Sequence, residues 1–259
     1  MTRGRVYLVG AGPGDPGLLT LRARDLLAVA DCVIYDYLVN PEILAHAPAH
    51  AELICVGKHC GEISWTQEEI NRLLVAKARE YGSVVRLKGG DPFIFGRGGE
   101  EAGALVAEGI EWEVVPGVTA GSAVAAYAGI PITHRGLSSA VTFITGHEDP
   151  AKSQSAIRWE QLATGADTLV FFMGVARIRE ISERLRQHGR DAQTPVAVIR
   201  WGTYEHQEVY VSDLAEIAAL VERERVKSPA IIIVGEVVRL REQLQWFAPQ
   251  LIEAALSVA

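Results

Sequence analysis

Residues 6–17 read VYLVGAGPGDPG, a short apolar run that passes directly into four closely spaced glycines. A strand that leads into a glycine-rich turn and then a helix is how α/β proteins bring backbone close to a ligand at the carboxyl end of a parallel sheet. The following residues, 20–30, have the pattern of such a helix. This stretch therefore predicts an α/β fold with a binding edge near the start of the chain.

The same alternation continues through the first half of the chain. Strands are expected at residues 6–10, 32–35, 52–56, 84–88 and 112–115, and helices at 20–30, 67–81 and 100–108. The helix over 67–81 is the clearest, because Thr66 and Glu69 form a capping box and Gly82 follows its end. Five strands separated by helices predict a parallel sheet that is covered on both faces.

The pattern changes after Pro116-Gly117. An alanine-rich helix over 118–129 precedes strands at 140–145, 168–173, 196–200, 208–211 and 230–234, with helices at 176–188 and 213–224. The strand at 208–211 follows its predecessor too closely for a crossover helix, so the second sheet should be mixed. We therefore expect two α/β domains, residues 1–116 and 117–259, with the active site in the cleft between them. Residues 146–158 are expected to form a loop, and residues 239–247 an amphipathic helix.

Composition narrows the class of protein. Apolar residues make up 49% of the 259 residues and charged residues 22%, as in a soluble globular protein. No apolar run approaches the roughly 20 residues that a bilayer needs, and no signal-peptide pattern precedes the first strand. The net charge of −7 argues against nonspecific nucleic-acid binding. Three cysteines argue against a disulfide framework and for a reducing, cytoplasmic location.

The first glycine turn is ambiguous on its own. The dinucleotide fingerprint needs glycines at its first, third and sixth positions, but the sixth is Asp15, and Pro13 removes an amide donor. Asp36 nevertheless ends the second strand, where dinucleotide-binding proteins hold a ribose. A nicotinamide or flavin site and a merely structural turn both remain open at this point.

Two other binding chemistries are excluded by residues 55–60. A phosphate-binding P-loop needs Ser or Thr after the Gly-Lys pair, but Gly57-Lys58 is followed by His59. Cys55, His59 and Cys60 lack a second pair at ligand spacing, so no metal site is expected.

The second glycine loop is the most unusual segment. Residues 86–101 read RLKGGDPFIFGRGGEE, in which six of sixteen residues are charged and five are glycine. The loop again follows the carboxyl end of a strand, and its glycines leave a bare backbone wall against which a flat ligand can lie. Two glycine loops at one edge of one sheet outline a pocket.

The two loops together resemble those of the tetrapyrrole methyltransferases. Residues 10–20 (GAGPGDPGLLT) and 85–101 carry the resemblance, and 115–119 (VPGVT), 129–135 (GIPITHR) and 228–235 (SPAIIIVG) fit the same family. The resemblance covers residues 6–247, nearly the whole chain. It implies two α/β domains, a homodimer, and transfer of methyl groups from S-adenosylmethionine to carbon atoms of a tetrapyrrole.

Within this family the sequence is most similar to members that methylate uroporphyrinogen III. The resemblance thus implies two transfers, at ring positions 2 and 7, that give precorrin-2 and S-adenosylhomocysteine. A member that methylates a later corrin precursor remains an alternative, as does an enzyme of the same fold that methylates RNA or protein. From other classes, a nucleotide-binding oxidoreductase and a catalytically silent tetrapyrrole carrier also stay open.

The resemblance also assigns cofactor contacts in both halves of the chain. They fall on Pro13, Gly89, Gly90, Asp91, Ile94, Thr119, Ala120, Met173, Gly202 and Ala230. An apolar slot made by Met173, Gly202 and Ala230 suits adenine, although a single methionine more often fills a core. Asp91 beside two glycine amides suits the charged methionine end of the cofactor.

The resemblance further implies Asp36 as proton acceptor and Lys58 as proton donor. A helix cap or a ribose contact remains an alternative for Asp36, and a carboxylate anchor for Lys58. Because the substrate carries many carboxylates, its site must be locally basic. The candidate substrate-binding residues all lie in turns: His59, Arg97, His134 and Arg135.

Overall fold

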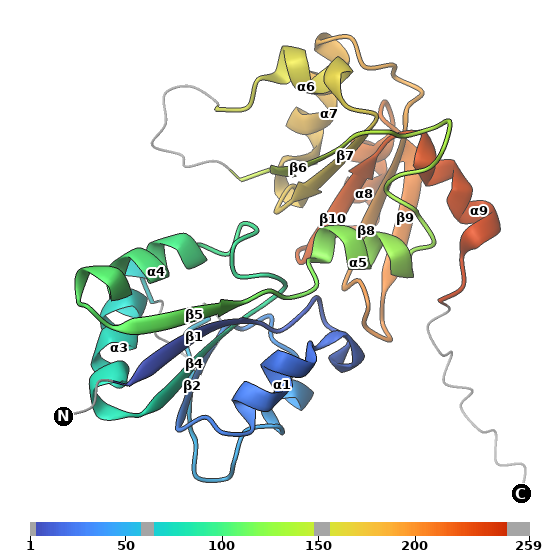
Figure 1. Cartoon of the computed structure of the whole chain (residues 1–259). Helices are drawn as coiled ribbons and strands as arrows, with labels where there is room; N and C mark the ends of the chain where they lie inside the picture. The colour runs from blue at the N-terminus through green and yellow to red at the C-terminus, as the bar shows by residue number, and fades with distance from the viewer. Residues whose placement is uncertain (1–3, 58–64, 148–155, 248–259) are drawn as a thin grey trace, which may run out of the picture. The chain divides into compact units, whose positions relative to one another are not determined.

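The computed structural model describes residues 4–57, 65–147 and 156–247 (Figure 1). The chain divides into two compact units, residues 1–123 and 124–259, and each contains one five-stranded sheet. The prediction of two α/β domains, one with a parallel and one with a mixed sheet, is confirmed.

The sheet of the first unit is entirely parallel. It contains β1 (Arg5–Gly10), β2 (Cys32–Tyr35), β3 (Glu52–Cys55), β4 (Ser83–Lys88) and β5 (Glu111–Val115), in the order β3-β2-β4-β1-β5. The chain leaves β1 toward β2 and leaves β4 in the opposite direction, toward β5. The neighbouring strands β1 and β4 are therefore the topological switch point, the usual place for a ligand in an open parallel sheet.

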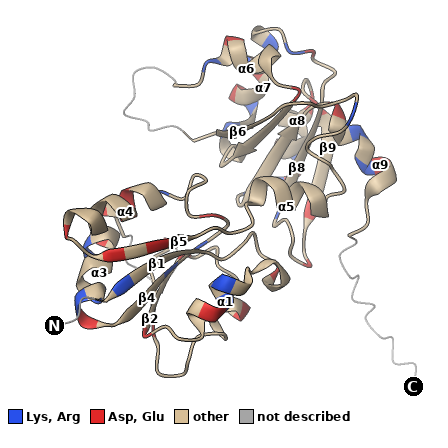
Figure 2. Ribbon diagram, viewed as in Figure 1, with Lys and Arg blue, Asp and Glu red and all other residues tan. Residues whose placement is uncertain are grey.

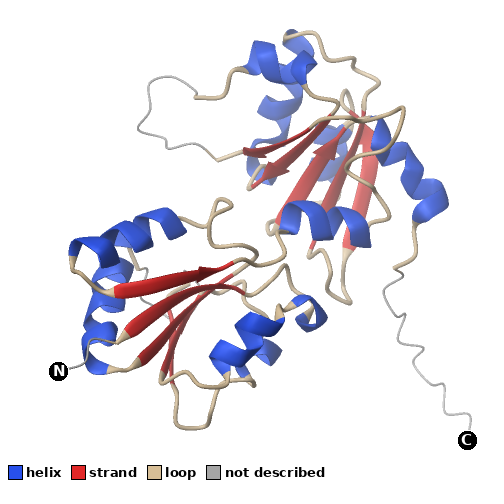
Figure 3. Ribbon diagram, in the orientation of Figure 1, coloured by secondary structure: helices blue, strands red, loops and turns tan. Residues whose placement is uncertain are grey.

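Helices cover both faces of this sheet (Figure 3). One core cluster packs α1 (Leu21–Leu27) and the short α2 (Pro41–Leu44) on one face, and a second packs α3 (Gln67–Glu80) and α4 (Gly98–Ala107) on the other. A 3₁₀ turn, η1 (Pro16–Leu18), precedes α1. The capping box predicted for α3 is present, with Thr66 and Glu69 bonded reciprocally. Along β4, Val84, Arg86 and Lys88 alternate with Val85 and Leu87, so the two basic residues lie on the face that α3 and α4 cover.

The sheet of the second unit is mixed. It contains β6 (Val141–Thr145), β7 (Thr168–Phe172), β8 (Pro195–Arg200), β9 (Glu208–Asp213) and β10 (Ala230–Val234), in the order β6-β7-β10-β8-β9. Only β6 and β7 pair in parallel; β10 is antiparallel to both its neighbours, and β8 and β9 form an antiparallel pair. Helix α5 (Ala120–Tyr127) contains the boundary between the units. The second unit also contains α6 (Trp159–Gly165), α7 (Ile178–Gln187), α8 (Ile217–Arg223) and α9 (Arg241–Leu244), with 3₁₀ turns η2 (Val175–Arg177) and η3 (Glu236–Leu240).

Some helix boundaries differ from the prediction for local reasons. The helix expected from residue 213 begins at Ile217, because Asp213 Oδ1 accepts hydrogen bonds from the amides of Ala215 and Glu216 and closes a turn first. The helix expected over 239–247 is wrong in extent, since α9 ends at Leu244 after the 3₁₀ turn η3. The short helices α2 and α6 were not predicted. Of the loop expected at 146–158, residues 148–155 lie outside the described residues.

Three observations bear on the expectations from composition. No helix within the described ranges is long and apolar enough to cross a membrane. Basic and acidic residues are interspersed on the surface helices, as α1 shows (Figure 2). Cys32 is buried and free, but Cys55 is disulfide-bonded, which the expectation of a reducing location and no disulfide framework did not predict.

Candidate functional site

The two glycine loops lie side by side at the switch point. The first loop leaves β1 and the second leaves β4, and a two-residue bridge joins them. Gly90 N donates to Gly12 O at 2.7 Å, and Gly12 N donates to Gly90 O at 3.2 Å. The expectation that both loops occupy one edge of the sheet is confirmed.

Three glycines let three backbone segments approach each other at this edge. A Cβ on Gly10 would lie 2.4 Å from Gly117 Cα, and a Cβ on Gly117 would lie 2.1 Å from Gly90 O. Gly90 has a φ of +69°, and the nearest atom to its own added Cβ would be Ala120 N, at 3.8 Å. The backbone of Gly90 is thus uncovered on that side, which fits a wall for a bound ligand.

Asp91 ties the second loop to the segment that follows β5. Its Oδ1 accepts a hydrogen bond from Phe93 N at 2.8 Å, and its Oδ2 accepts one from Gly117 N at 3.0 Å. Each oxygen retains capacity for a further hydrogen bond. The Asp91 carboxylate therefore braces the loops and can still meet a cationic group of a ligand.

All the cofactor residues predicted in the first unit follow the carboxyl ends of β1, β4 and β5. Thr119 O accepts hydrogen bonds from the amides of Ser122 and Ala123 and so begins α5, which starts at Ala120. The strand ends bring together three short segments, which contain Pro13, then Gly89, Gly90, Asp91 and Ile94, then Thr119 and Ala120.

The cofactor residues predicted in the second unit also share one sheet edge. Met173 follows β7, Gly202 lies just after β8, and Ala230 begins β10. The pairing of Ile231 with Phe172 and of Ala230 with Arg200 sets these positions next to each other. Half of the Met173 surface is exposed and its φ is +55°, so the core-packing alternative for this residue is wrong.

Gly202 has a packing role that the sequence did not reveal. A Cβ at this position would lie 2.4 Å from Val124 Cγ1 and 2.5 Å from Val124 Cγ2. Its neighbours Trp201 and Thr203 have φ values of +47° and +71°, which are unfavourable for residues with side chains. Gly202 is therefore needed where the turn after β8 passes over α5, whatever else it contacts.

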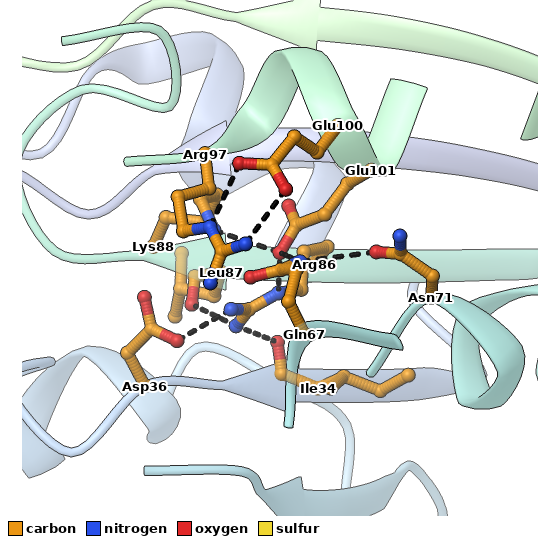
Figure 4. A network of polar contacts seen from close by, with 10 residues as sticks. All are labelled: Ile34, Asp36, Gln67, Asn71, Arg86, Leu87, Lys88, Arg97, Glu100 and Glu101. Atoms are coloured by element: carbon orange, nitrogen blue, oxygen red, sulfur yellow. Dashed lines mark hydrogen bonds and ion pairs between the residues drawn. The ribbon is translucent and has the colours of Figure 1, made fainter. Parts of the chain in front are cut away.

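A buried ion network stands behind the first-unit edge (Figure 4). Arg86 Nε donates to Glu101 Oε1 at 3.0 Å, and Arg86 Nη2 donates to Asp36 Oδ1 at 2.5 Å. Lys88 Nζ also donates to Glu101 Oε1, at 2.8 Å. Arg86, Lys88 and Glu101 are buried, whereas the Asp36 side chain is 32% exposed.

Burial and charge act in opposite directions on the two cations. Burial alone lowers the pKa of Arg86, but the carboxylates of Asp36 and Glu101 outweigh it and raise that pKa above its ordinary value. Burial lowers the pKa of Lys88, and the neighbouring Arg86 charge lowers it further, against a smaller opposing effect of the carboxylates. Arg86 is thus a permanent cation between two carboxylates.

Asp36 is not a helix cap. The cap of α2 is Asn40, whose Oδ1 accepts a hydrogen bond from Glu42 N at 3.0 Å. Asn40 Nδ2 donates to Gly14 O at 2.9 Å and so ties the turn that carries Asp36 to the first glycine loop. Asp36 therefore lies at the same edge as the predicted cofactor residues, with part of its carboxylate open to solvent.

The predicted substrate residues are only partly placed. Lys58 and His59 lie outside the described residues. Arg97 forms a two-point ion pair with Glu100, at 2.8 and 2.7 Å, and this bond lowers the pKa of Glu100. His134 and Arg135 are exposed in the second unit, where His134 Nδ1 lies 2.9 Å from Arg135 O.

Sequence reasoning missed Glu101 and Asn40 as parts of this edge, and it singled out neither Arg86 nor Lys88. A signal for Glu101 was present, because residues 98, 101, 102 and 105 are spaced as the inward stripe of a helix. Two basic residues in a strand of a doubly covered sheet also demand a buried partner. For Asn40 no sequence signal distinguishes a loop tether from an ordinary helix cap. Within the described parts of the chain, no group of three or more His, Cys, Asp or Glu side chains is arranged to hold a metal ion.

Comparison with known proteins places this geometry in a family. The family described as Tetrapyrrole (Corrin/Porphyrin) Methylases matches residues 5–218. An S-adenosyl-L-methionine-dependent uroporphyrinogen III methyltransferase of Methanosarcina barkeri is 57% identical over 93% of this chain and 94% of its own length. A uroporphyrinogen-III C-methyltransferase of Bacillus subtilis is 47% identical over 99% of both chains. A sirohaem synthase of Azotobacter vinelandii is 55% identical over 94% of this chain, which spans only 52% of that protein.

Solved structures agree with the sequence relatives. The uroporphyrin-III C-methyl transferase of Thermus thermophilus in complex with S-adenosylhomocysteine is 43% identical, with a TM-score of 0.79 over 92% of this chain and 100% of its own. A cobalt precorrin-4 methyltransferase is 28% identical, with a TM-score of 0.80 over 90% of this chain and 95% of its own. The chain therefore belongs to the tetrapyrrole methylase family.

Proposed function

We propose that this chain is an S-adenosylmethionine-dependent enzyme that methylates uroporphyrinogen III at ring positions 2 and 7. The products are precorrin-2 and S-adenosylhomocysteine, which places the reaction in sirohaem and cobalamin biosynthesis. The observation that carries the proposal is the match over nearly the whole chain to relatives named for this substrate. A later corrin precursor is the second candidate, because a cobalt precorrin-4 methyltransferase has the same fold.

The residues present fit the cofactor. The uncovered backbone of Gly90 and the braced Asp91 carboxylate suit the charged methionine end. The exposed Met173 side chain, with Gly202 and Ala230 at the same sheet edge, suits a flat apolar group such as adenine. We propose that the full binding set is Pro13, Gly89, Gly90, Asp91, Ile94, Thr119, Ala120, Met173, Gly202 and Ala230.

The chemistry asks for positioning and for proton transfer. Bound S-adenosylmethionine supplies an electrophilic methyl group, which an electron-rich pyrrole carbon accepts with its own electron pair. A proton then leaves the ring system, and we propose Asp36, half-buried at the edge of the site, as its acceptor. Lys58 is proposed as the proton donor. Arg97, His134, Arg135 and His59 are proposed to bind the substrate carboxylates.

We also propose that the chain works as a homodimer in the cytoplasm. Size-exclusion chromatography with light scattering tests the dimer, because a mass near 28 kDa would be that of a single chain. Twice that mass supports the proposal.

Ligand-induced stabilisation tests the cofactor. A ligand at a hundredfold excess over its Kd stabilises the folded state by about 2.7 kcal/mol. S-adenosylhomocysteine should therefore raise the melting temperature, and NAD and NADP should leave it unchanged. Stabilisation by NAD or NADP but not by S-adenosylhomocysteine would contradict the methyltransferase proposal and favour a nucleotide-binding oxidoreductase.

Turnover tests the substrate. Under anaerobic conditions, release of S-adenosylhomocysteine is measured with uroporphyrinogen III and, separately, with a later corrin precursor. The proposal predicts release with uroporphyrinogen III. Release with the later precursor alone would favour the second candidate.

A further inference from the structure

The guanidinium of Arg86 is fixed at each of its three nitrogens. Nε bonds to Glu101 and Nη2 to Asp36, while Nη1 donates to the carbonyl oxygens of Ile34 and Leu87 at 3.4 and 3.3 Å (Figure 4). The side chain is 2% exposed. This planar group is held by backbone carbonyls of two strands, β2 and β4, and by the carboxylates of Glu101 and Asp36, so it has no freedom to reorient.

The two carboxylates that hold Arg86 are not equivalent. Glu101 is fully buried, and its Oε1 accepts from Arg86, Lys88 and Gln67. The Glu101 Oε2 atom is also buried, and no group within the described residues bonds to it. Of these two carboxylates, only Asp36 reaches solvent. The network thus has a buried anchor at Glu101 and one open end at Asp36.

The balance of formal charges links the exposed carboxylate of Asp36 to the buried part of the network. Arg86 and Lys88 bring two positive charges, and Glu101 and Asp36 bring two negative ones. Removing one member leaves an uncompensated charge in a region that water does not reach. Asp36 is therefore held as the counter-ion of Arg86, and its carboxylate has a set direction.

We propose that Arg86 is a positioning residue for Asp36, and that Glu101 anchors Arg86 for this task. The inference rests on the proposed role of Asp36 as proton acceptor. A base must stand within hydrogen-bond reach of the proton that it removes, and a displacement of about 1 Å can cost roughly a hundredfold in rate. Arg86 and Glu101 hold the Asp36 carboxylate in place without themselves contacting the reacting groups.

A network that only braces β4 against α4 would give a different result. Such a brace affects the stability of the fold and cofactor binding, but it has no reason to affect the catalytic rate of correctly folded enzyme. Separation of kcat from KM, combined with the coupling between Arg86 and Asp36, distinguishes the two roles.

The test compares Arg86→Lys, Asp36→Asn and the double variant in the anaerobic assay with uroporphyrinogen III. Lysine keeps the charge but replaces the rigid planar fork, whose separate nitrogens meet Glu101 and Asp36, by a single ammonium nitrogen. We expect Arg86→Lys to lower kcat by about 10–100-fold, with the KM for S-adenosylmethionine and the stabilisation by S-adenosylhomocysteine unchanged. The double variant should be no slower than Asp36→Asn. Arg79→Lys is the matched control, because Arg79 forms an exposed ion pair with Glu108 in the same unit.

The outcomes separate this inference from the proposed function. If Asp36→Asn keeps the wild-type kcat, the proposed role of Asp36 is wrong. If Asp36→Asn is slow but Arg86→Lys keeps the wild-type kcat, or if the two losses multiply in the double variant, Arg86 does not act through Asp36. Should Arg86→Lys not fold, Glu101→Gln decides, since it keeps the shape of the anchor and removes its charge. We expect a several-fold lower kcat for a folded Glu101→Gln enzyme, and a wild-type kcat would overturn the proposal.

Discussion

At the scale of single residues, several glycines of the site serve the approach of one backbone to another. Gly10, Gly90 and Gly117 are within van der Waals range of each other's main chains, and Gly202 lies against the side chain of Val124. At Gly10, Gly117 and Gly202 these contacts leave no room for a Cβ, and they cannot be recognised from a glycine-rich loop alone. A glycine in this site can therefore fail to tolerate alanine for reasons that have nothing to do with a ligand.

Gly202→Ala should destabilise the fold by about 1–3 kcal/mol, because the added methyl group overlaps both Val124 methyl groups. Urea unfolding measures the loss. A Val124→Ala background removes both methyl groups and leaves only the Val124 Cβ, 2.8 Å from the added Cβ, so Gly202→Ala should cost less stability there than in the wild type. The affinity of the double variant for S-adenosylhomocysteine then reports the ligand contact of Gly202 by itself. A single variant as stable as wild type would contradict this packing role.

Asp91→Ala should weaken S-adenosylhomocysteine binding by about tenfold or more, because it removes a charged acceptor and two hydrogen bonds that hold the loops. Isothermal titration calorimetry measures the change. Asp25→Ala on the exposed face of α1 is the control and should bind normally. Unchanged affinity of Asp91→Ala would remove this residue from the site.

At the scale of elements, the ten strands of the described residues were predictable because β-branched runs and glycine turns alternate so regularly. The ends of helices were not, since they depend on particular hydrogen bonds such as those of Asp213 in the turn before α8. Helices of four to seven residues, such as α2 and α6, carry too little periodicity to be recognised. Helix α4 shows a further limit of periodicity. Its inward stripe, where apolar residues are expected, contains the charged Glu101, which pairs with Arg86 and Lys88.

Helix α3 is joined to β3 by an ion pair that should make stability depend on pH. Lys77 Nζ donates to Glu52 Oε2 at 2.6 Å, and this hydrogen bond holds the pKa of Glu52 below its ordinary 4.5. A lowered carboxyl pKa contributes stability above that ordinary value and loses it as the pH falls through the lowered one. Lys77→Met should therefore destabilise most at neutral pH, and its difference from wild type should shrink below about pH 4.5.

Urea unfolding at pH 7 and pH 3.5 checks this dependence, with the exposed Lys227→Met as control. Equal destabilisation by Lys77→Met at both pH values would show that the ion pair does not carry the effect.

At the scale of the whole molecule, the order of the first sheet accounts for the location of the site. The strands that precede the two glycine loops, β1 and β4, are neighbours in the sheet although β2, β3 and α3 lie between them in the sequence.

 

The chain turns in opposite directions after β1 and β4, so the loops that follow these two paired strands meet at one edge of the sheet. Alternating strands and helices predict a parallel sheet, but they do not predict its strand order. The pairing of the loops had to be seen in the structure.

The identity of the ligand could not be derived from the predicted fold or from the observed one. The first glycine turn has the shape of a dinucleotide turn, and Asp36, which matches a ribose contact in sequence, is instead paired with Arg86. The second loop carried the resemblance to the family, and the comparisons confirmed that family. Arg97, one of the basic residues proposed to bind the substrate, is paired with Glu100 in the structure, a contact that the sequence analysis did not predict.

The most direct test of the central claim is the number of methyl groups added to each ring. Uroporphyrinogen III is incubated anaerobically with S-adenosylmethionine that carries an isotopically labelled methyl group, and the product is analysed by mass spectrometry. We expect two labelled methyl groups per ring, at positions 2 and 7, with one S-adenosylhomocysteine released for each. A ring that acquires no label, while a later corrin precursor is labelled under the same conditions, would contradict it.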